Sequence, residues 1–210
     1  MIRIAIADDH PLIRRGLAKL IEREIDMELV NEYQDTRYLL KHFDAQTCDI
    51  LVLDLSFPDS NGLDVLERIR AIWPKLKILV MSMHPEEQYA LRAMKAGAQG
   101  YISKNSSSAE LIGAFRKIAR GARYYTEAVV EKMAGGYLEQ TSDKPHEQLT
   151  NREFQVFMML ARGLSVQEIS RLLVLSSNTV YTFRRRIFDK MNLQTNAGLI
   201  HYAVQNKLVN

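Results

Sequence analysis

The first 120 residues alternate short apolar runs with longer amphipathic stretches, and this alternation constrains the fold more than any other feature. The apolar or β-branched runs are IRIAIA, MELVNEY, DILVLDL, KILVMSM and AQGYIS. The stretches that follow them place apolar residues three and four positions apart, which is the spacing of one helix face. Strands that alternate with helices form a parallel sheet covered by helices on both faces. The sequence therefore predicts an α/β domain built on a five-stranded parallel sheet.

The last third of the chain has a different pattern. Four short segments with helical spacing each begin near Ser, Thr or Asn: LTNREFQVFMMLARG, SVQEISRLLV, SSNTVYTFRRRIFDKM and TNAGLIHYAVQNK. The polar run TSDKPHEQ before them is typical of a linker, and TEAVVEKMAGGYLEQ predicts a helix opened by Thr126. We therefore expect a first domain over residues 1–122, a linker helix and linker over 123–145, and an all-α four-helix domain over 146–210.

Basic charge is concentrated in that last domain. The chain has a net charge of +3, whereas residues 148–210 carry 8 Lys and Arg against 3 Asp and Glu, a net +5. A small basic unit favours a polyanionic partner, usually nucleic acid, although a merely solvated basic surface remains the alternative.

The remaining composition indicates a cytoplasmic protein without a membrane partner. Cys48 is the only cysteine, which suits a reducing compartment. Negative charge appears already at Asp8, too early for a signal peptide, and no apolar run approaches the ~18 residues of a membrane span.

Polar side chains follow four of the five predicted strands. Asp8 and Asp9 follow the first, Asp54 the third, Ser82 the fourth and Lys104 the fifth. One such residue is ordinarily a helix cap, but four strands that each deliver a functional group make capping a poor joint explanation. The carboxyl ends of parallel strands meet at one edge of a sheet, where ligands bind. We therefore expect one site.

The residue types at this edge predict phosphoryl transfer. Converging carboxylates repel each other and need a cation, and oxygen ligands with open positions suit Mg²⁺ better than Ca²⁺. A metal, an ammonium group and a hydroxyl around one carboxylate describe a phosphoryl-transfer site. Asp54 is the predicted nucleophile, because carboxylates form acyl phosphates.

Four sequence pieces carry a family resemblance: ADDHPLIRRGL, LVLDLSFPDSNGLDVL, VMSMH and GYISK resemble the flavodoxin-like receiver domain of NarL/FixJ-type response regulators. The resemblance implies that Mg²⁺ is held by Asp8, Asp9, Asp54 and the backbone carbonyl of Ser56. It also implies that Asp54 accepts phosphate from a sensor histidine kinase and that Ser82 and Lys104 contact the phosphoryl oxygens.

The resemblance further implies a switch. Tyr101 matches the family's aromatic switch position and would fill the space left when a phosphoryl group draws the Ser82 hydroxyl inward. Ser56 and His84 are expected beside the path of attacking water, where they would set the lifetime of the acyl phosphate.

The basic domain contains a predicted helix-turn-helix. SVQEISRLLV followed by LSSNTVYTFRRRIFDKM provides a short helix, a tight turn and a second helix that can lie in the major groove. An outward Arg185 is suited to guanine, whereas Arg184 and Arg186 at its sides are suited to phosphate. The alternative is a solvated helix face. The candidate DNA contacts are Ser177, Asn178, Tyr181, Thr182, Arg184, Arg185 and Arg186.

The pieces LTNREFQVFMMLARGLSVQEIS and NTVYTFRRRIFDKMNL resemble the LuxR-type DNA-binding domain. That family pairs through its last helix, here TNAGLIHYAVQNK, which implies a homodimer.

We therefore predict a regulator of transcription, not an enzyme, whose dimerisation and sequence-specific DNA binding are controlled by phosphorylation at Asp54. Its expected partners are a sensor histidine kinase, promoter DNA, a second copy of the chain and RNA polymerase. A Mg²⁺-dependent phosphatase and a constitutive DNA-binding protein with a vestigial pocket are the alternatives.

Overall fold

The computed structural model describes all residues except 59, 128, 132–143 and 210, and the chain divides into two compact units, Met1–Leu138 and Glu139–Asn210. Each unit is described by itself. Within the described residues, no helix is long and apolar enough to cross a bilayer.

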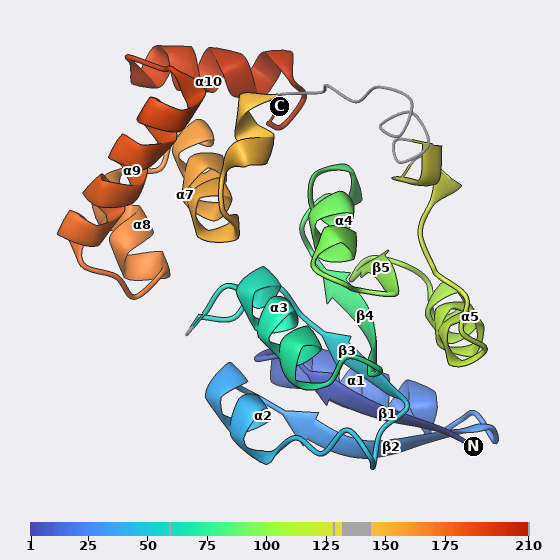
Figure 1. Ribbon diagram of the computed structural model, residues 1–210. Helices are drawn as coiled ribbons and strands as arrows, with labels where there is room; N and C mark the ends of the chain where they lie inside the picture. Colours follow the sequence, from blue (N-terminus) through green and yellow to red (C-terminus); the bar gives the residue numbers. More distant parts are fainter. Residues whose placement is uncertain (59, 128, 132–143, 210) are drawn as a thin grey trace. The chain divides into compact units, whose positions relative to one another are not determined.

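The first unit is built on a five-stranded, all-parallel sheet with the strand order β2-β1-β3-β4-β5 (Figure 1). The strands are β1 Ile2–Ala7, β2 Met27–Tyr33, β3 Ile50–Leu53, β4 Lys77–Ser82 and β5 Gly100–Ser103. The helices are α1 Pro11–Ile21, α2 Thr36–His42, α3 Gly62–Ile72, α4 Glu86–Lys95 and α5 Ser108–Ala119. The predicted α/β fold, with its order of strands and helices, is confirmed.

The sheet is closed off from water by its helices. Every residue of β3 is buried, as expected for a central parallel strand. On one face, Ile4, Ile6 and Val52 pack in a single core cluster with Leu17 of α1 and Phe115 of α5. The strand alternation sends neighbouring side chains to the opposite face. The strand ends are therefore the part of the sheet at which polar groups can gather.

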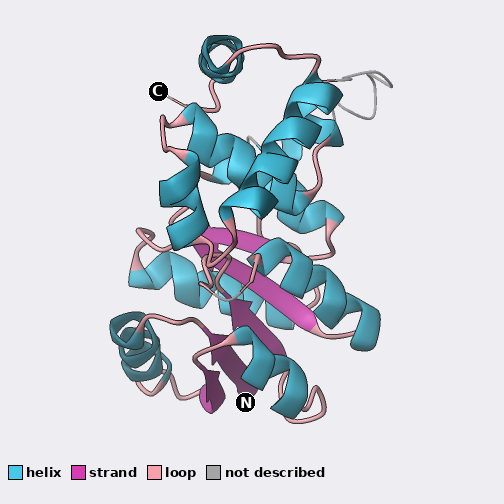
Figure 2. Cartoon of the chain, turned by 90° about the vertical axis from the view of Figure 1, so that its left-hand side faces the viewer, coloured by secondary structure: helices cyan, strands magenta, loops and turns pink. Residues whose placement is uncertain are grey.

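The second unit is helical throughout its described elements (Figure 2). It contains a 3₁₀ turn η1 (Pro145–Gln148), α7 (Asn151–Ala161), α8 (Val166–Leu172), α9 (Ser177–Met191) and α10 (Asn196–Gln205). The four predicted α-helices are confirmed.

Each α-helix of this unit starts at a side-chain cap, whereas η1 has none. Thr150 and Ser165 form capping boxes with Glu153 and Glu168, and Ser176 caps α9 through the backbone N–H of Thr179. The core contains Phe154, Phe157, Ile169, Val180, Ile187 and Leu199. The turn between α8 and α9 places Val174 at φ +51°.

The segment between the units is partly outside the described residues. Helical structure is described at 127 and 129–131, after Thr126. The predicted linker run falls on 141–148, of which 141–143 lie outside the described residues. Its last residues form η1, where His146 Nδ1 lies 2.7 Å from the Tyr202 hydroxyl.

Candidate functional site

Backbone hydrogen bonds between neighbouring strands place the predicted polar residues at one edge of the sheet. Backbone pairing continues past the strands, because Asp54 N donates to Ala7 O (2.9 Å) and Lys104 N donates to Ser82 O (2.9 Å). Asp8 N likewise donates to the carbonyl oxygen of a β2 residue. Asp8, Asp54 and Lys104 thus directly follow β1, β3 and β5, whereas Ser82 is the last residue of β4 rather than the first residue after it.

Lys104 joins the two buried carboxylates. Its Nζ lies 2.7 Å from Asp54 Oδ2 and 2.7 Å from Asp8 Oδ2. Asp8 and Asp54 are each 1% exposed, and the Lys104 side chain is 4% exposed. Burying a charged side chain is unfavourable, so groups this deeply buried stay ionised only when each charge has a close partner of opposite sign. The sequence prediction that these three residues converge agrees with the structure.

The pKa values in this cluster are shifted by burial and by pairing. Burial raises the pKa of Asp54 above its ordinary value, and the nearby charge of Asp8 acts in the same direction, although Lys104 opposes both. Burial lowers the pKa of Lys104, but its hydrogen bonds to Asp54 and Asp8 outweigh burial and raise it. Lys104 therefore stays protonated and supplies a fixed positive charge.

The cluster has the donor set for a hard cation. Ligand atoms of Asp8, Asp9, His10 and Asp54 lie within 4.8 Å of one another. Asp54 Oδ1 is buried and has no hydrogen-bond partner among the described residues. A buried carboxylate oxygen without a donor is unfavourable unless a cation or another ligand meets it. Three converging carboxylates therefore fit Mg²⁺.

Two residues near the cluster were not singled out from the sequence. His10 Nδ1 lies 2.7 Å from Asp9 Oδ1, and Arg14 donates from Nη1 to the backbone carbonyl of Asp8 (2.7 Å). Adjacency to the aspartates was the only sequence signal for His10. Arg14 lies in the next helix, and only the fold brings it beneath the loop.

The switch candidates form a short chain of contacts. Ser82 is fully buried, and its Oγ accepts from the backbone N–H of His84 (3.1 Å). The Tyr101 hydroxyl donates to the backbone carbonyl of His84 (2.8 Å), and this side chain is 1% exposed. Tyr101 therefore occupies an inward position, and the loop after β4 connects it to Ser82.

Ser56 and His84 are brought together as well. Ser56 Oγ and His84 Nε2 are 3.3 Å apart, and the imidazole stacks on the Tyr89 ring with centroids 4.3 Å apart. The role of the Ser56 carbonyl as a metal ligand stays a prediction.

The recognition-helix candidates lie on α9 and differ in how they are held. Thr182, Arg185 and Arg186 are exposed, and Tyr181 is 50% exposed. The Arg185 side chain is 86% exposed and only loosely paired with Asp189, at 3.9 Å. These groups are accessible from solvent.

The other candidates on α9 are more constrained. Arg184 donates from Nη2 to Asn196 Oδ1 (3.1 Å), and its guanidinium lies 4.8 Å from the Phe188 ring centroid. Asn178 is exposed and its carbonyl accepts from the Thr182 hydroxyl (2.9 Å), while Ser177 is half-buried. Arg184 is therefore fixed to the second unit itself, unlike Arg185.

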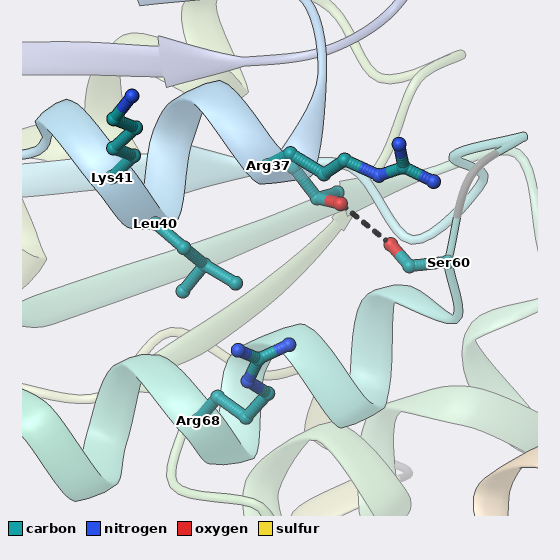
Figure 3. Close-up of a pocket in the computed structure, with 6 residues that line it drawn as sticks. Arg37, Leu40, Lys41, Ser60 and Arg68 are labelled. Carbon is teal, nitrogen blue, oxygen red and sulfur yellow. Dashed lines mark hydrogen bonds between the residues drawn. The ribbon is translucent and has the colours of Figure 1, made fainter.

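A shallow pocket of about 390 Å³ lies elsewhere on the first unit, between α2 and α3 (Figure 3). Its lining is Thr36, Arg37, Leu40, Lys41, Ser60 and Arg68. The three cations are exposed, and Ser60 Oγ donates to Thr36 Oγ1 at 2.9 Å (Figure 3). Among the described residues, no buried unpartnered polar atom belongs to this lining. The pocket is therefore a solvated basic surface and shares no residue with the acidic cluster.

Comparisons with known proteins agree with both halves of the chain. The response regulator receiver domain model matches residues 4–116, and the model of bacterial regulatory proteins of the luxR family matches residues 147–203. Response regulator UvrY of Escherichia coli strain K12 is 31% identical over 100% of this chain and 97% of its own length. Response regulator GacA of Pseudomonas aeruginosa is 30% identical over 100% of this chain and 98% of its own.

A solved structure with the same fold is that of RcsB from Salmonella enterica serovar Typhimurium, bound to promoter rprA with the phosphomimetic BeF₃⁻. It has a TM-score of 0.66, 23% identity, and covers 97% of this chain and 99% of its own. The family models and the relatives account for both units, and the fold agrees. The chain therefore belongs to the NarL/FixJ-type response regulators, two-component transcription regulators that join a receiver domain to a LuxR-type DNA-binding domain.

Proposed function

We propose that Asp54 is the phosphoacceptor of this regulator, and that its phosphorylation by a sensor histidine kinase controls DNA binding by α9. The observation that carries the proposal is the pairing at Asp54. Lys104 neutralises Oδ2 at 2.7 Å, whereas the buried Oδ1 has no partner among the described residues. One carboxylate oxygen is thus anchored and the other is available to react.

The step is a direct phosphoryl transfer. Asp54 Oδ1 attacks the phosphorus of the kinase phosphohistidine, an O–P bond forms, and the P–N bond breaks with its electron pair leaving on the imidazole nitrogen. Lys104 and Ser82 supply donors to the phosphoryl oxygens. Positioning and charge stabilisation carry most of the catalysis in such transfers.

Asp8, Asp9, Asp54 and the Ser56 carbonyl would hold Mg²⁺, which supplies neutralisation of the phosphoryl charge when it is bound. The carboxylate cluster within 4.8 Å supports this choice. Arg14 fixes the Asp8 backbone through its carbonyl and so orients the loop that carries both N-terminal aspartates.

The DNA-binding half of the proposal rests on accessibility. Arg185 is 86% exposed on the helix that follows the helix-turn-helix turn. A free guanidinium can make the paired contact with guanine that is the commonest specific major-groove contact. Tyr181, Thr182 and Arg186 lie exposed on the same helix. Ser177 and Asn178 begin it, and backbone groups at helix N-termini also contact phosphate.

We propose that a second copy pairs through α10. Ile200 is 39% exposed and Val204 is 50% exposed, while Leu199 and Ala203 of the same helix are buried in the unit's own core. One face of α10 thus packs inside, and another offers apolar surface to a partner. A symmetric dimer would place two α9 helices about one turn of DNA apart. Contact with RNA polymerase and a cytoplasmic location stay predictions.

One experiment tests the proposal as a whole. The full chain is incubated with Mg²⁺ and a small phosphoramidate, and intact mass is measured for the wild type and for Asp54→Asn. The expected result is one added phosphoryl group in the wild type and none in the variant. Equal labelling of both proteins would contradict the assignment of Asp54.

DNA binding is read in the same samples by selection from a random pool. Enrichment of one sequence that strengthens on phosphorylation supports the proposal. Identical enrichment with and without phosphorylation would favour constitutive DNA binding, and steady turnover of small phosphate esters would favour a phosphatase.

A further inference from the structure

The outer edge of the receiver sheet is covered by the chain that follows α5. β5 is the last strand in the sheet order, so its outer backbone groups would otherwise lack a strand partner. Tyr124 forms a parallel bridge with Gly100: Tyr101 N donates to Tyr124 O (3.0 Å), and Tyr124 N donates to Gln99 O (2.9 Å). We name residues 124–126 the strap.

Two further contacts fasten the strap, at its middle residue and at its last. The Tyr125 hydroxyl donates to the Ala98 carbonyl (2.6 Å), just before β5. Thr126 N donates to Glu86 Oε1 (3.2 Å), at the first residue of α4. The strap therefore contacts β5 and α4 at once.

Gly100 is needed for this close approach. A Cβ at position 100 would lie 2.9 Å from Tyr124 O and 3.0 Å from Ile118 Cδ1. Real Cβ atoms rarely come so near to backbone oxygen, and the strap would have to shift. The strap thus depends on a glycine within the GYISK piece.

The strap is also where the connection to the second unit begins. Thr126 O accepts from Val129 N and Val130 N, both at 3.1 Å, so the strap ends in a helical turn. The Glu86 carboxylate therefore lies at the N-terminal end of that turn, where a negative charge is favourable.

The strap is connected to the pocket through the β4–α4 loop. His84 donates from its backbone to Ser82 Oγ and accepts from the Tyr101 hydroxyl. Tyr101 donates from its own backbone to the strap, and Glu86 stands two residues after His84. A displacement of Ser82 toward Asp54 would therefore alter two hydrogen bonds of the strap, the one between Tyr101 N and Tyr124 O and the one between Thr126 N and Glu86.

We propose that the strap is the first relay from the phosphoacceptor pocket to the connection: a phosphoryl group on Asp54 draws Ser82 inward, shifts the β4–α4 loop and releases Thr126 from Glu86. The proposal rests on the proposed function of Asp54. By reciprocity, weakening the Glu86–Thr126 contact must then strengthen binding of a phosphoryl mimic at Asp54.

The experiment uses the full chain, with Mg²⁺ and BeF₃⁻ as the phosphoryl mimic. Hydrogen exchange is followed in the peptide that covers the strap, and BeF₃⁻ affinity is measured by calorimetry. In the wild type, saturation with BeF₃⁻ should speed exchange at the strap. In Glu86→Ala the strap should exchange faster before any addition, and BeF₃⁻ should bind about threefold tighter, the order expected for one hydrogen bond.

Three variants make the test specific. Glu86→Gln keeps an acceptor oxygen and should restore near wild-type exchange and affinity. Tyr125→Phe removes a contact that the relay does not change, so it should speed exchange at the strap and leave BeF₃⁻ affinity at the wild-type value. Glu127→Ala removes an exposed carboxylate next to the strap and should change neither.

The outcomes separate the two proposals. If the wild type binds no BeF₃⁻ in the presence of Mg²⁺, the proposed function of Asp54 fails and the relay fails with it. If BeF₃⁻ binds but leaves strap exchange unchanged or slower, or if Glu86→Ala matches the wild type in affinity, the relay alone is wrong.

Discussion

The phosphoacceptor pocket and the recognition helix hold their functional groups in opposite ways. In the pocket, Asp8, Asp54 and Lys104 are almost fully buried and pair with one another at 2.7 Å. On α9, Arg185 is 86% exposed, and its nearest carboxylate lies 3.9 Å away. The pocket is assembled from four strand ends, whereas α9 presents its groups from a single helix. Replacing a pocket residue should therefore disturb its neighbours, whereas replacing an exposed α9 residue should affect the partner alone.

The largest effect is expected from Lys104→Met, which leaves two buried carboxylates without their cation. The free energy of unfolding of the first unit should fall by about 3 kcal/mol in the presence of a chelator, the low end for breaking a buried ion pair. Mg²⁺ should restore part of the loss, because it replaces the missing charge. Urea unfolding followed at Trp73, the only tryptophan, measures the first unit alone.

Lys75→Met is the matched control, because Lys75 is exposed. It should unfold like the wild type with and without Mg²⁺. If Lys104→Met lost no stability in the chelator, the buried pocket would tolerate the loss of a charge as an exposed surface does, which would contradict its dependence on Lys104.

A second contrast concerns two adjacent arginines of α9. Arg185→Ala should weaken binding to the selected DNA about tenfold without lowering stability, since one paired base contact contributes roughly 1–3 kcal/mol. Arg184→Ala should instead lower the stability of the second unit by about 1 kcal/mol, because it loses Asn196 and the Phe188 ring. Gel shift and thermal unfolding of both variants give the two readings. Equal loss of stability in both variants would contradict the distinction.

Glu153 tests whether the second unit contains a buried pair like that of the pocket. Glu153 is 3% exposed and accepts from Lys190 Nζ at 2.6 Å. Burial raises the pKa of Glu153, but the hydrogen bonds from Lys190 and from the Thr150 backbone outweigh it and hold the pKa below its ordinary value. Glu153→Gln keeps the cap acceptor but loses the charge, so it should cost about 2 kcal/mol at neutral pH.

The sign of the pH dependence follows from the lowered pKa. The contribution of Glu153 is fully present above its unfolded pKa and is lost as the pH falls through the lower folded value. The gap between wild type and Glu153→Gln should therefore close in acid. Glu168→Gln is the control, because Glu168 occupies the same capping-box position on α8 but is exposed. Circular dichroism across pH measures both, and a gap that widened in acid would refute the assignment.

The smallest effect is expected at the turn between α8 and α9. Val174 is 75% exposed and adopts φ +51°, a left-handed conformation that is unfavourable for a β-branched residue. Val174→Gly should stabilise the second unit by about 0.5–1 kcal/mol, after the larger entropy of glycine in the unfolded chain is subtracted.

Asn192, the C-cap of α9, is the matched control. It adopts the same left-handed φ, which asparagine tolerates better than valine does. Asn192→Gly should change the thermal midpoint less than Val174→Gly does. If Val174→Gly destabilised the second unit, the contacts of the valine side chain would contribute more stability than its left-handed backbone costs.

The predicted strands, their order along the chain and the five polar residues at their ends follow from local patterns in the sequence. Apolar runs of strand length specify burial, and parallel topology brings their carboxyl ends to one edge. The candidate groups at that edge are therefore identifiable from the sequence alone. Arg14 and Glu86 were not, because nothing local indicates that a helix residue supports Asp8 or that an α4 carboxylate accepts from Thr126.

The arginines of α9 illustrate the same limit. Helical spacing predicts that Arg185 points outward with Arg184 and Arg186 at its sides, and nothing in the run RRR distinguishes Arg184 from Arg186. Only the packing of α10 against the rest of its unit fastens Arg184 to Asn196 and leaves Arg185 in solvent.

By itself the sequence determined the α/β and helical halves, the acidic edge and the basic helix, because these depend on periodicity and residue type along the chain. The tertiary structure decided which oxygen of Asp54 is anchored, which arginine of α9 is held by its own unit and how the strap covers β5. Those features depend on contacts between residues far apart in the chain, and distances of that kind are set by the packing of the whole unit.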